Sequence, residues 1–233
     1  MATIRLGAVS LSALLIAAPA FAQLDKDDVK DLNQAATVLG EIRNAPDKGI
    51  PESIWKKAEC VVVIPSLKKA GFIVGGEGGD GVMSCRQAGR WTAPVFMDLA
   101  KASFGLQAGA QSTQLVLLIM NRKGLDKLLS NKVTLGADAS IAAGPVGRTA
   151  SAATDAQLTA EMLSYSRSKG LFAGIDLSGG SLKPDKDANA RAYGANVTAR
   201  DVALGTARVE MTPEAKAFRE ALGRDTRGTS GVR

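Results

Sequence analysis

The sequence contains no histidine, and this absence removes most of the familiar catalytic constellations. Histidine is the commonest general base in proteins and the usual partner of a serine or cysteine nucleophile. Besides Cys60 and Cys85 there is no further cysteine, so the chain cannot assemble an ordinary zinc site, which needs three or four ligands. We therefore expect a protein without a metal or another cofactor, and one that is not an enzyme.

Aromatic residues are also scarce, at 4% of the chain. Single-stranded nucleic acid is commonly bound on stacked aromatic side chains beside clustered basic residues, and the basic residues of this chain are scattered. Nucleic acid is therefore not an expected partner. The formal net charge is nevertheless +6, which favours other anionic partners such as phospholipid head groups.

A hydrophobic run long enough to cross a bilayer is missing as well. The apolar run at residues 6–18 has roughly 13 residues, where a spanning helix needs about 20. It follows Arg5 and precedes Ala20-Phe21-Ala22, which is the order of a secretory signal peptide, and we expect cleavage after Ala22. The mature chain would then be periplasmic or secreted, at the periphery of the envelope membrane.

The two cysteines both lie in the expected mature chain and bracket a segment that looks like a short sheet. An even pair in an oxidising compartment predicts a disulfide between Cys60 and Cys85. Two buried free thiols are the alternative.

The segment Lys26–Arg43 has the spacing of an amphipathic helix. Its apolar residues recur every three or four positions and make one face apolar: Val29, Leu32, Ala36, Leu39 and Ile42. Pro51 suits the start of a second, shorter helix that runs to Lys57. Such helices either pack on a core or lie on a membrane, and periodicity does not separate the two.

From residue 60 onward the sequence becomes rich in β-branched residues and glycine. We predict a buried strand at 60–65 and a hairpin formed by 71–74 and 81–85, with the glycine-rich 75–80 as its turn. Other expected elements are strands at 91–97, 104–110, 114–120, 133–141 and 171–177, a helix at Arg122–Ser130 capped by Asn121, a loop passing into a helix within 144–162, and a helix at Lys186–Tyr193.

These elements predict an α+β fold: a curved, barrel-like antiparallel sheet flanked by N-terminal and central helices. The expected organisation is a signal peptide at 1–22, N-terminal amphipathic helices at 23–57, the sheet-bearing domain at 58–222 and a mobile polar tail at 223–233.

Several short motifs resemble catalytic or nucleotide-binding signatures. Gly76, Gly78 and Gly81 match G-x-G-x-x-G, but the following residues continue as strand, where a dinucleotide site needs a helix. Ser66 with Lys69 and Ser166 with Lys169 match S-x-x-K without the companion motifs of a serine–lysine hydrolase. The carboxylate pairs Glu77 with Asp80 and Asp155 with Glu161 are expected to be solvated or to cap helices.

Basic residues next to glycine are the strongest candidates for a binding site. Glycine lets a phosphate group approach backbone amides, and a neighbouring cation can then bind its oxygens. We expect such phosphate clamps at Lys68, Lys69, Arg148, Arg167 and Lys169. Ordinary surface charge is the alternative at each position.

Six ordered segments resemble the SYLF-domain family over residues 58–194. They are Lys69-Ala70-Gly71-Phe72, Trp91-Thr92-Ala93-Pro94, Phe104-Gly105-Leu106-Gln107-Ala108-Gly109, the stretch from Gly136 to Arg148 that contains Gly144-Pro145-Val146-Gly147, Tyr165-Ser166-Arg167-Ser168-Lys169-Gly170-Leu171-Phe172-Ala173-Gly174, and Asp187-Ala188-Asn189-Ala190-Arg191-Ala192-Tyr193-Gly194. The resemblance implies a lipid-binding module. Eukaryotic members bind phosphoinositides and some bind actin, whereas exported bacterial members are thought to bind envelope phospholipid.

The resemblance also implies that an N-terminal amphipathic helix contacts the membrane. In this chain the corresponding residues are Val29, Leu32, Leu39, Trp55, Lys56 and Lys57, with Trp55 as an interfacial anchor. Because a signal peptide is expected, actin and phosphoinositide are not expected as natural partners. The sequence predicts non-enzymatic binding of anionic phospholipid or a membrane surface. The alternatives are a structural or protein-partner-binding envelope protein and a serine–lysine hydrolase.

Overall fold

The structure is a computed structural model that describes residues 24–43, 49–71, 74–104, 112–130, 132–146, 159–168 and 171–223. Its helices are α1 (Lys26–Arg43), α2 (Glu52–Lys57), α3 (Arg122–Ser130), α5 (Lys186–Tyr193), α6 (Ala199–Ala203) and α7 (Pro213–Ala221). Its strands are β1 (Cys60–Gly71), β2 (Val74–Gln87), β3 (Arg90–Trp91), β4 (Val95–Phe104), β5 (Ser112–Ile119), β6 (Val133–Thr134), β7 (Ile141–Ala143), β8 (Met162–Ser168), β9 (Leu171–Gly174) and β10 (Ser181–Pro184). Of the predicted tail at 223–233, all residues after Gly223 lie outside the described residues.

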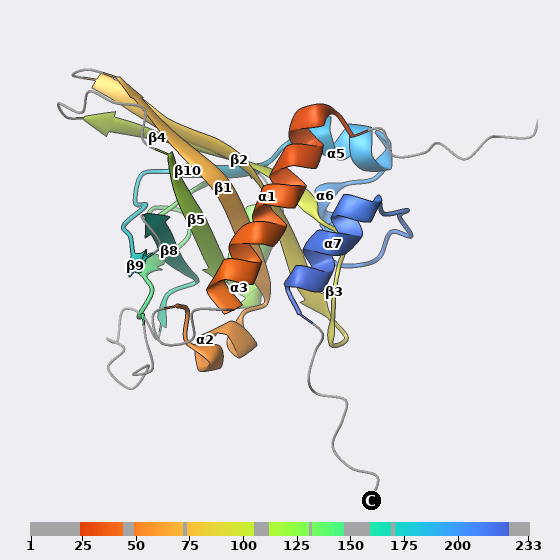
Figure 1. Cartoon of the computed structure of the whole chain (residues 1–233), viewed down its shortest axis with the longest axis horizontal. Coiled ribbons are helices and arrows are strands. Elements are labelled where there is room, and N and C mark those ends of the chain that lie inside the picture. Colours follow the sequence, from red (N-terminus) through yellow and green to blue (C-terminus); the bar gives the residue numbers. More distant parts are fainter. Residues whose placement is uncertain are drawn as a thin grey trace, which may run out of the picture.

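A single strongly curled sheet organises the molecule, and Figure 1 shows α1 lying across β1 and β2 with α7 beside it. The strands follow the order β6-β10-β4-β2-β1-β5-β8-β7, while β3 pairs with β2 and β9 with β8. Neighbouring strands are antiparallel except β7 and β8, which are parallel. The predicted α+β class with a curled, barrel-like sheet is confirmed. The prediction that all strands pair antiparallel is wrong for β7 and β8.

The two faces of the sheet carry separate hydrophobic cores. Side chains alternate along a strand, so Val61 and Val63 of β1 point to one face and Val62 and Ile64 to the other. Apolar residues of α1, α2, α5 and α7 cover the first face, and those of α3 and α6 cover the second. The central strands therefore read as continuous apolar runs because both of their faces are buried.

The sequence left open whether the helix at Lys26–Arg43 packs on the core or lies on a membrane. In the structure this helix, α1, packs on the core. Its apolar stripe is buried against the sheet, with Leu32 fully buried and Leu39 only 1% exposed. Burying a leucine side chain contributes about 1.5–3 kcal/mol, so this stripe is a large part of the fold's stability.

The glycine-rich stretch at 75–80 was predicted as a turn, and this prediction is wrong. Strand β2 runs through it without interruption, and the register with β1 shifts between Val63 and Lys68. A Cβ atom on Gly81 would lie 2.2 Å from the carbonyl oxygen of Val63, and one on Gly79 would lie 2.7 Å from that of Ser66. The glycines are needed because β1 approaches β2 closely at this irregularity, and not because the chain turns.

Other boundaries were placed less well by the sequence. The predicted strand at 133–141 is divided into β6 and β7 by a turn, and the one at 91–97 is interrupted by residues 92–94. Strands β8 and β10 and helices α6 and α7 were not anticipated. In contrast, α1, α3 and α5 have the predicted bounds, and the Asn121 side chain caps α3 by accepting a hydrogen bond from the backbone of Gly124.

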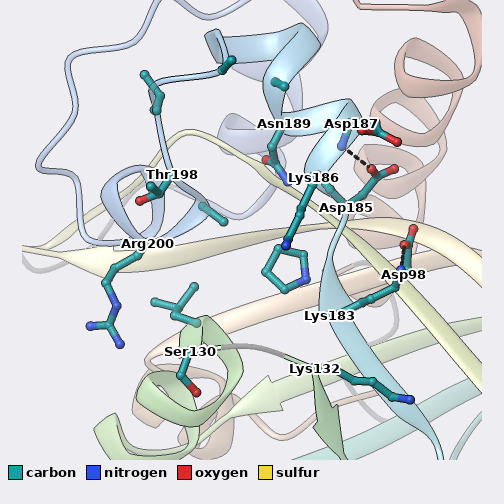
Figure 2. A pocket seen from close by; sticks show the side chains of 16 residues that line it. Asp98, Ser130, Lys132, Lys183, Asp185, Lys186, Asp187, Asn189, Thr198 and Arg200 are labelled. Carbon is teal, nitrogen blue, oxygen red and sulfur yellow. Dashed lines mark hydrogen bonds and ion pairs between the residues drawn. The ribbon is translucent and has the colours of Figure 1, made fainter.

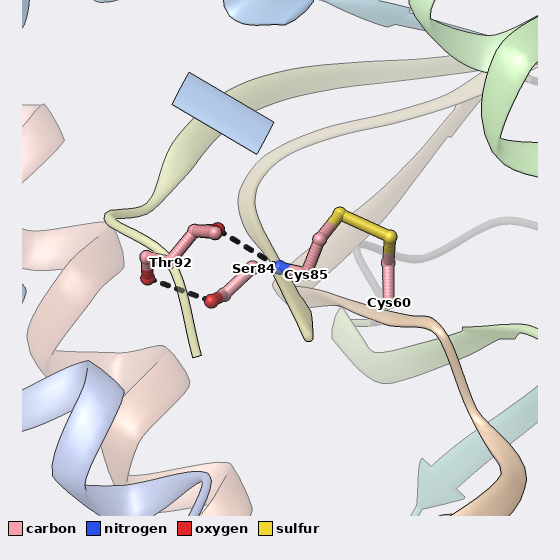
Figure 3. Close-up of a disulfide and its surroundings, with 4 residues drawn as sticks. All are labelled: Cys60, Ser84, Cys85 and Thr92. Carbon is pink, nitrogen blue, oxygen red and sulfur yellow. Dashed lines mark hydrogen bonds between the residues drawn. A yellow bond between two sulfur atoms is a disulfide. The ribbon is translucent and has the colours of Figure 1, made fainter. Parts of the chain in front are cut away.

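The expected cysteine pair lies within the first hairpin. Cys60 of β1 is opposite Cys85 of β2, with the two sulfur atoms 2.14 Å apart, at bonding distance (Figure 3). Next to it, the Ser84 hydroxyl donates to the carbonyl oxygen of Thr92, and the Cys85 amide donates to the Thr92 hydroxyl at 3.1 Å. The segment after β3 is thereby tied to the buried end of β2.

Candidate functional site

The structure describes two of the five predicted phosphate clamps with their side chains. Lys68 is exposed on β1, and Arg167 is half-buried on β8. Of Lys69 only the backbone is described, opposite Glu77 of β2. Arg148 and Lys169 lie outside the described residues.

Strand register brings these two residues to the same face and the same end of the sheet. Lys68 is opposite Ser112 of β5, and Gln114 of β5 is opposite Arg167. Opposite residues share a face, as do residues two apart on one strand, so Lys68 and Arg167 point to the same side. Standard strand spacing puts their Cα atoms on the order of 12 Å apart. Two such long side chains can reach one phosphate or two neighbouring head groups.

The charges of both residues are partly compensated by carboxylates. Arg167 forms an ion pair with Glu41 of α1 and a hydrogen bond from its Nη1 to Gln114 Oε1 at 3.1 Å. Lys68 lies near Asp80 of β2. This face therefore presents cations that already balance acidic groups of the protein.

The predicted membrane-contact residues divide into buried and exposed members. Leu32, Leu39 and Trp55 are buried, whereas Lys56 and Lys57 are exposed, and Val29 is half-buried. The Trp55 ring lies 6.5 Å from that of Trp91, over which the Arg86 guanidinium stacks at 4.4 Å. In this arrangement Trp55 contributes to the core and does not reach the surface as an anchor.

Three carboxylates form an acidic row beneath α1. Asp80 of β2 is directly opposite Asp98 of β4, and Asp31 approaches from α1. Burial, followed by repulsion from Asp80, raises the pKa of Asp31 to about 6. Burial and then the Asp98 carboxylate raise the pKa of Asp80. Within the described residues no group of three or more histidine, cysteine, aspartate or glutamate side chains could bind a metal ion.

The most deeply buried acidic side chain serves a structural role. Glu161 accepts hydrogen bonds from Lys127 at 2.9 Å and from the backbone of Ser140 at 3.1 Å, and Lys123 lies 3.1 Å away. Burial alone would raise the pKa of Glu161, but the hydrogen bonds from the two lysines lower it below its usual value. Glu161 thus joins α3 to the segments before β7 and β8, and the prediction that it is solvated or caps a helix is wrong.

The serine–lysine motifs do not have the helical geometry that their chemistry needs. Ser66 lies within β1, where residues three apart point to opposite faces, and its hydroxyl is 2.9 Å from that of Ser112. Ser166 also lies within a strand, β8, and Lys169 is outside the described part of the chain.

A concave site that sequence reasoning missed lies between β10, α3, α5 and α6. It is a pocket of about 720 Å³ with four cations in its lining: Lys132, Lys183, Lys186 and Arg200. These residues are spread over about 70 positions of the sequence, and no local motif links them. Only the folded chain brings them together.

No helix in the described part of the chain is long and apolar enough to cross a membrane.

Comparisons with known proteins place the chain in a family. A model of the family Ysc84, described as "Las17-binding protein actin regulator", matches residues 100–225, which is more than half of the chain. The match includes α6 and α7, beyond the segments that carried the resemblance in the sequence.

Individual relatives match over a larger part of the chain. "LAS seventeen-binding protein 3" of Saccharomyces cerevisiae is 38% identical over 167 residues, which are 70% of this chain and 36% of that protein. "SH3 domain-containing YSC84-like protein 1" of Xenopus laevis is 33% identical over 197 residues, which are 81% of this chain and 58% of that protein. The chain thus spans between about a third and three fifths of the length of these relatives, and it belongs to the Ysc84 family, whose domain is the SYLF domain.

Proposed function

We propose that this protein binds anionic phospholipid at a membrane surface of the bacterial envelope and does not transform it chemically. The observation that carries the proposal is the placement of Lys68 and Arg167 on one face, at one end of the sheet, on either side of β5. A lysine supplies a point charge there and an arginine can bind two phosphate oxygens at once.

The Arg167–Glu41 ion pair gives this binding a structural consequence. A phosphate that binds Nη1 of Arg167 competes with the Glu41 carboxylate, and Glu41 belongs to the last two turns of α1. The exchange would weaken the attachment of α1 at this end. Buried residues of α1 such as Leu39 could then reach a bilayer, which they do not do while the helix is packed.

A second candidate function is the binding of a protein partner in the envelope. It is favoured by the matched family's description, which names Las17 binding and actin regulation. Because this chain spans only part of its relatives, those partners are not transferred to it. A chain that binds neither neutral nor anionic vesicles would favour this second function.

The proposal is tested by co-sedimentation with vesicles of phosphatidylcholine, with and without phosphatidylglycerol. We expect binding only when the anionic lipid is present. Replacing Lys68→Ala together with Arg167→Ala should weaken it about 30-fold, since each basic residue near an anionic surface contributes about 1 kcal/mol.

The matched control is Lys26→Ala together with Lys216→Ala, which removes the same charge from exposed positions on α1 and α7. This control should lose much less affinity than the Lys68 and Arg167 pair. Equal binding to neutral vesicles, or equal losses in the two double variants, would contradict the proposal.

Export is a separate part of the proposal. Expression of the full chain in a bacterium should place it in the periplasmic fraction, with Gln23 as the first residue by mass spectrometry. Recovery of the uncleaved chain from the cytoplasm would contradict this part.

A further inference from the structure

The pocket between β10, α3, α5 and α6 has the size and the lining of a ligand site. Its volume of about 720 Å³ falls within the range of roughly 300–1,000 Å³ that is usual for small-molecule sites. Figure 2 shows Lys186 extending into the middle of the view, with Arg200 on one side and Lys183 and Lys132 on the other. This pocket is formed by elements other than β1, β5 and β8, which position Lys68 and Arg167.

Two of the four cations around the pocket have no carboxylate partner in the described part of the chain. Lys183 pairs with Asp98 at 3.1 Å and Arg200 pairs with Asp126 at 3.3 Å. Lys132 and Lys186 are exposed and form no ion pair with any described residue. The pocket therefore has two uncompensated ammonium groups at its rim.

The three carboxylates in the lining, Asp98, Asp185 and Asp187, differ in the partners that they bind. Asp98 is already paired with Lys183, and Asp185 accepts hydrogen bonds from the backbone amides of Asp187 and Ala188 at the start of α5. Asp187 is exposed on the first turn of α5. With Asp126, which pairs with Arg200, the four cations are matched by four carboxylates, but Lys132 and Lys186 are in no ion pair with a described residue. An anion can therefore bind at these two ammonium groups without displacing a paired carboxylate.

Beneath the charged rim, the pocket has apolar wall residues that include Leu129, Pro184 and Val197. A ligand that consists of an anionic group joined to a short carbon chain would match this combination. A bare inorganic anion would leave the apolar wall unused.

Hydrogen bonds within the fold hold two of the pocket walls, α5 and α6, in place. The Asn189 side chain, which is 4% exposed, accepts a hydrogen bond from the Phe96 amide and donates one to its carbonyl oxygen, so that α5 is anchored to β4. The start of α6 is ordered by reciprocal capping between Thr198 and Asp201. Preformed walls lower the entropic cost of binding.

We propose that this pocket binds a phosphate ester with a short carbon skeleton, of the glycerol phosphate type. Lys132 and Lys186 bind the phosphate, and the apolar wall contacts the carbon skeleton. The same chemistry occurs in the head group of a phospholipid and in a free phosphate ester. Only the lipid source rests on the function proposed above.

The test is a titration of the isotope-labelled mature chain with sn-glycerol 3-phosphate, followed by amide NMR shifts. We expect the shifts to concentrate on residues around Lys132, Lys186 and Thr198. Replacing Lys132→Ala together with Lys186→Ala should weaken binding roughly 100-fold, because each hydrogen bond to a charged group is worth about a factor of ten or more. A second variant, Ala195→Phe, should weaken it by filling the pocket from an exposed position without altering any charge.

The control pair Lys26→Ala and Lys216→Ala should leave the titration unchanged. Absence of shifts, shifts centred elsewhere, or full binding by the Lys132 and Lys186 double variant would overturn the pocket. The same variants in the phosphatidylglycerol vesicle assay identify the source of the ligand. Loss of both glycerol phosphate and vesicle binding indicates a lipid head group, and loss of glycerol phosphate binding alone indicates a free ester.

The two proposals fail separately. Binding of glycerol phosphate without any vesicle binding contradicts the membrane function and supports the pocket. Vesicle binding without glycerol phosphate binding supports the membrane function and contradicts the pocket.

Discussion

The face of the sheet beneath α1 and the pocket beside β10 both contain several cations, but they use them differently. Under α1, Arg167 is paired with Glu41, and Arg191 binds Asp28 through two contacts of 3.0 and 3.1 Å. At the pocket, Lys132 and Lys186 have no such partner in the described chain. The comparison shows that a ligand competes with a carboxylate of the protein for Arg167, whereas it meets no such competitor at Lys132 and Lys186 among the described residues.

The largest expected effect concerns the cations that attach α1. Replacing Arg191→Ala leaves the Asp28 side chain, which is 8% exposed, without its cation, and we expect the free energy of unfolding to fall by about 2 kcal/mol. Replacing Lys186→Ala, which removes an exposed cation without a described ion pair, should change it by less than about 0.5 kcal/mol. Urea denaturation of the three proteins makes the measurement. Similar losses in both variants would remove the distinction between the two regions.

A smaller effect concerns the acidic row beneath α1. The pKa of Asp31 in the folded protein is about 6, above its ordinary value of 3.8, so the folded state retains a proton that the unfolded state releases between these values. The stability of the protein should therefore fall as pH rises from 4 to 6. Lys30 opposes this shift, whereas Asp27, Asp28 and Asp80 reinforce it.

The variant Asp31→Asn carries no charge in either state and should lack this component of the pH dependence. Thermal unfolding of both proteins between pH 4 and 7 measures it, with Glu220→Gln on the exposed side of α7 as the control. If the stability of the Asp31→Asn protein falls with pH as steeply as that of the parent, the acidic row does not destabilise the attachment of α1.

The sequence predicted the elements whose signals are local. The apolar spacing of Lys26–Arg43 and the Asn121 cap depend on nearby residues, and both are found in the structure. The cysteines are 25 residues apart, and their pairing could be predicted because the chain offers each of them one partner. The glycines of β2 were wrongly predicted to form a turn. Glycine is needed at Gly81 because Val63, a residue on another strand, approaches the backbone too closely for a Cβ atom. Periodicity cannot report such a contact.

The candidate site was harder to predict for the same reason. Sequence placed Lys68 and Arg167 in one set, and strand register does bring them to one face. It gave no indication that Glu41 would pair with Arg167, or that Lys132 and Lys186 would line the same pocket. The first contact depends on how α1 packs on the sheet, and the pocket depends on how α3, α5 and α6 pack beside β10.

The ends of the curled sheet have a consequence for the behaviour of the protein at high concentration. The hydrogen-bonded path ends on β6 with two residues and on β7 with three, which are among the shortest strands of the described chain. Strands this short expose few unpaired amide and carbonyl groups to which a second molecule could add a strand. The fold thus limits edge-to-edge aggregation while its central strands remain long and strongly apolar.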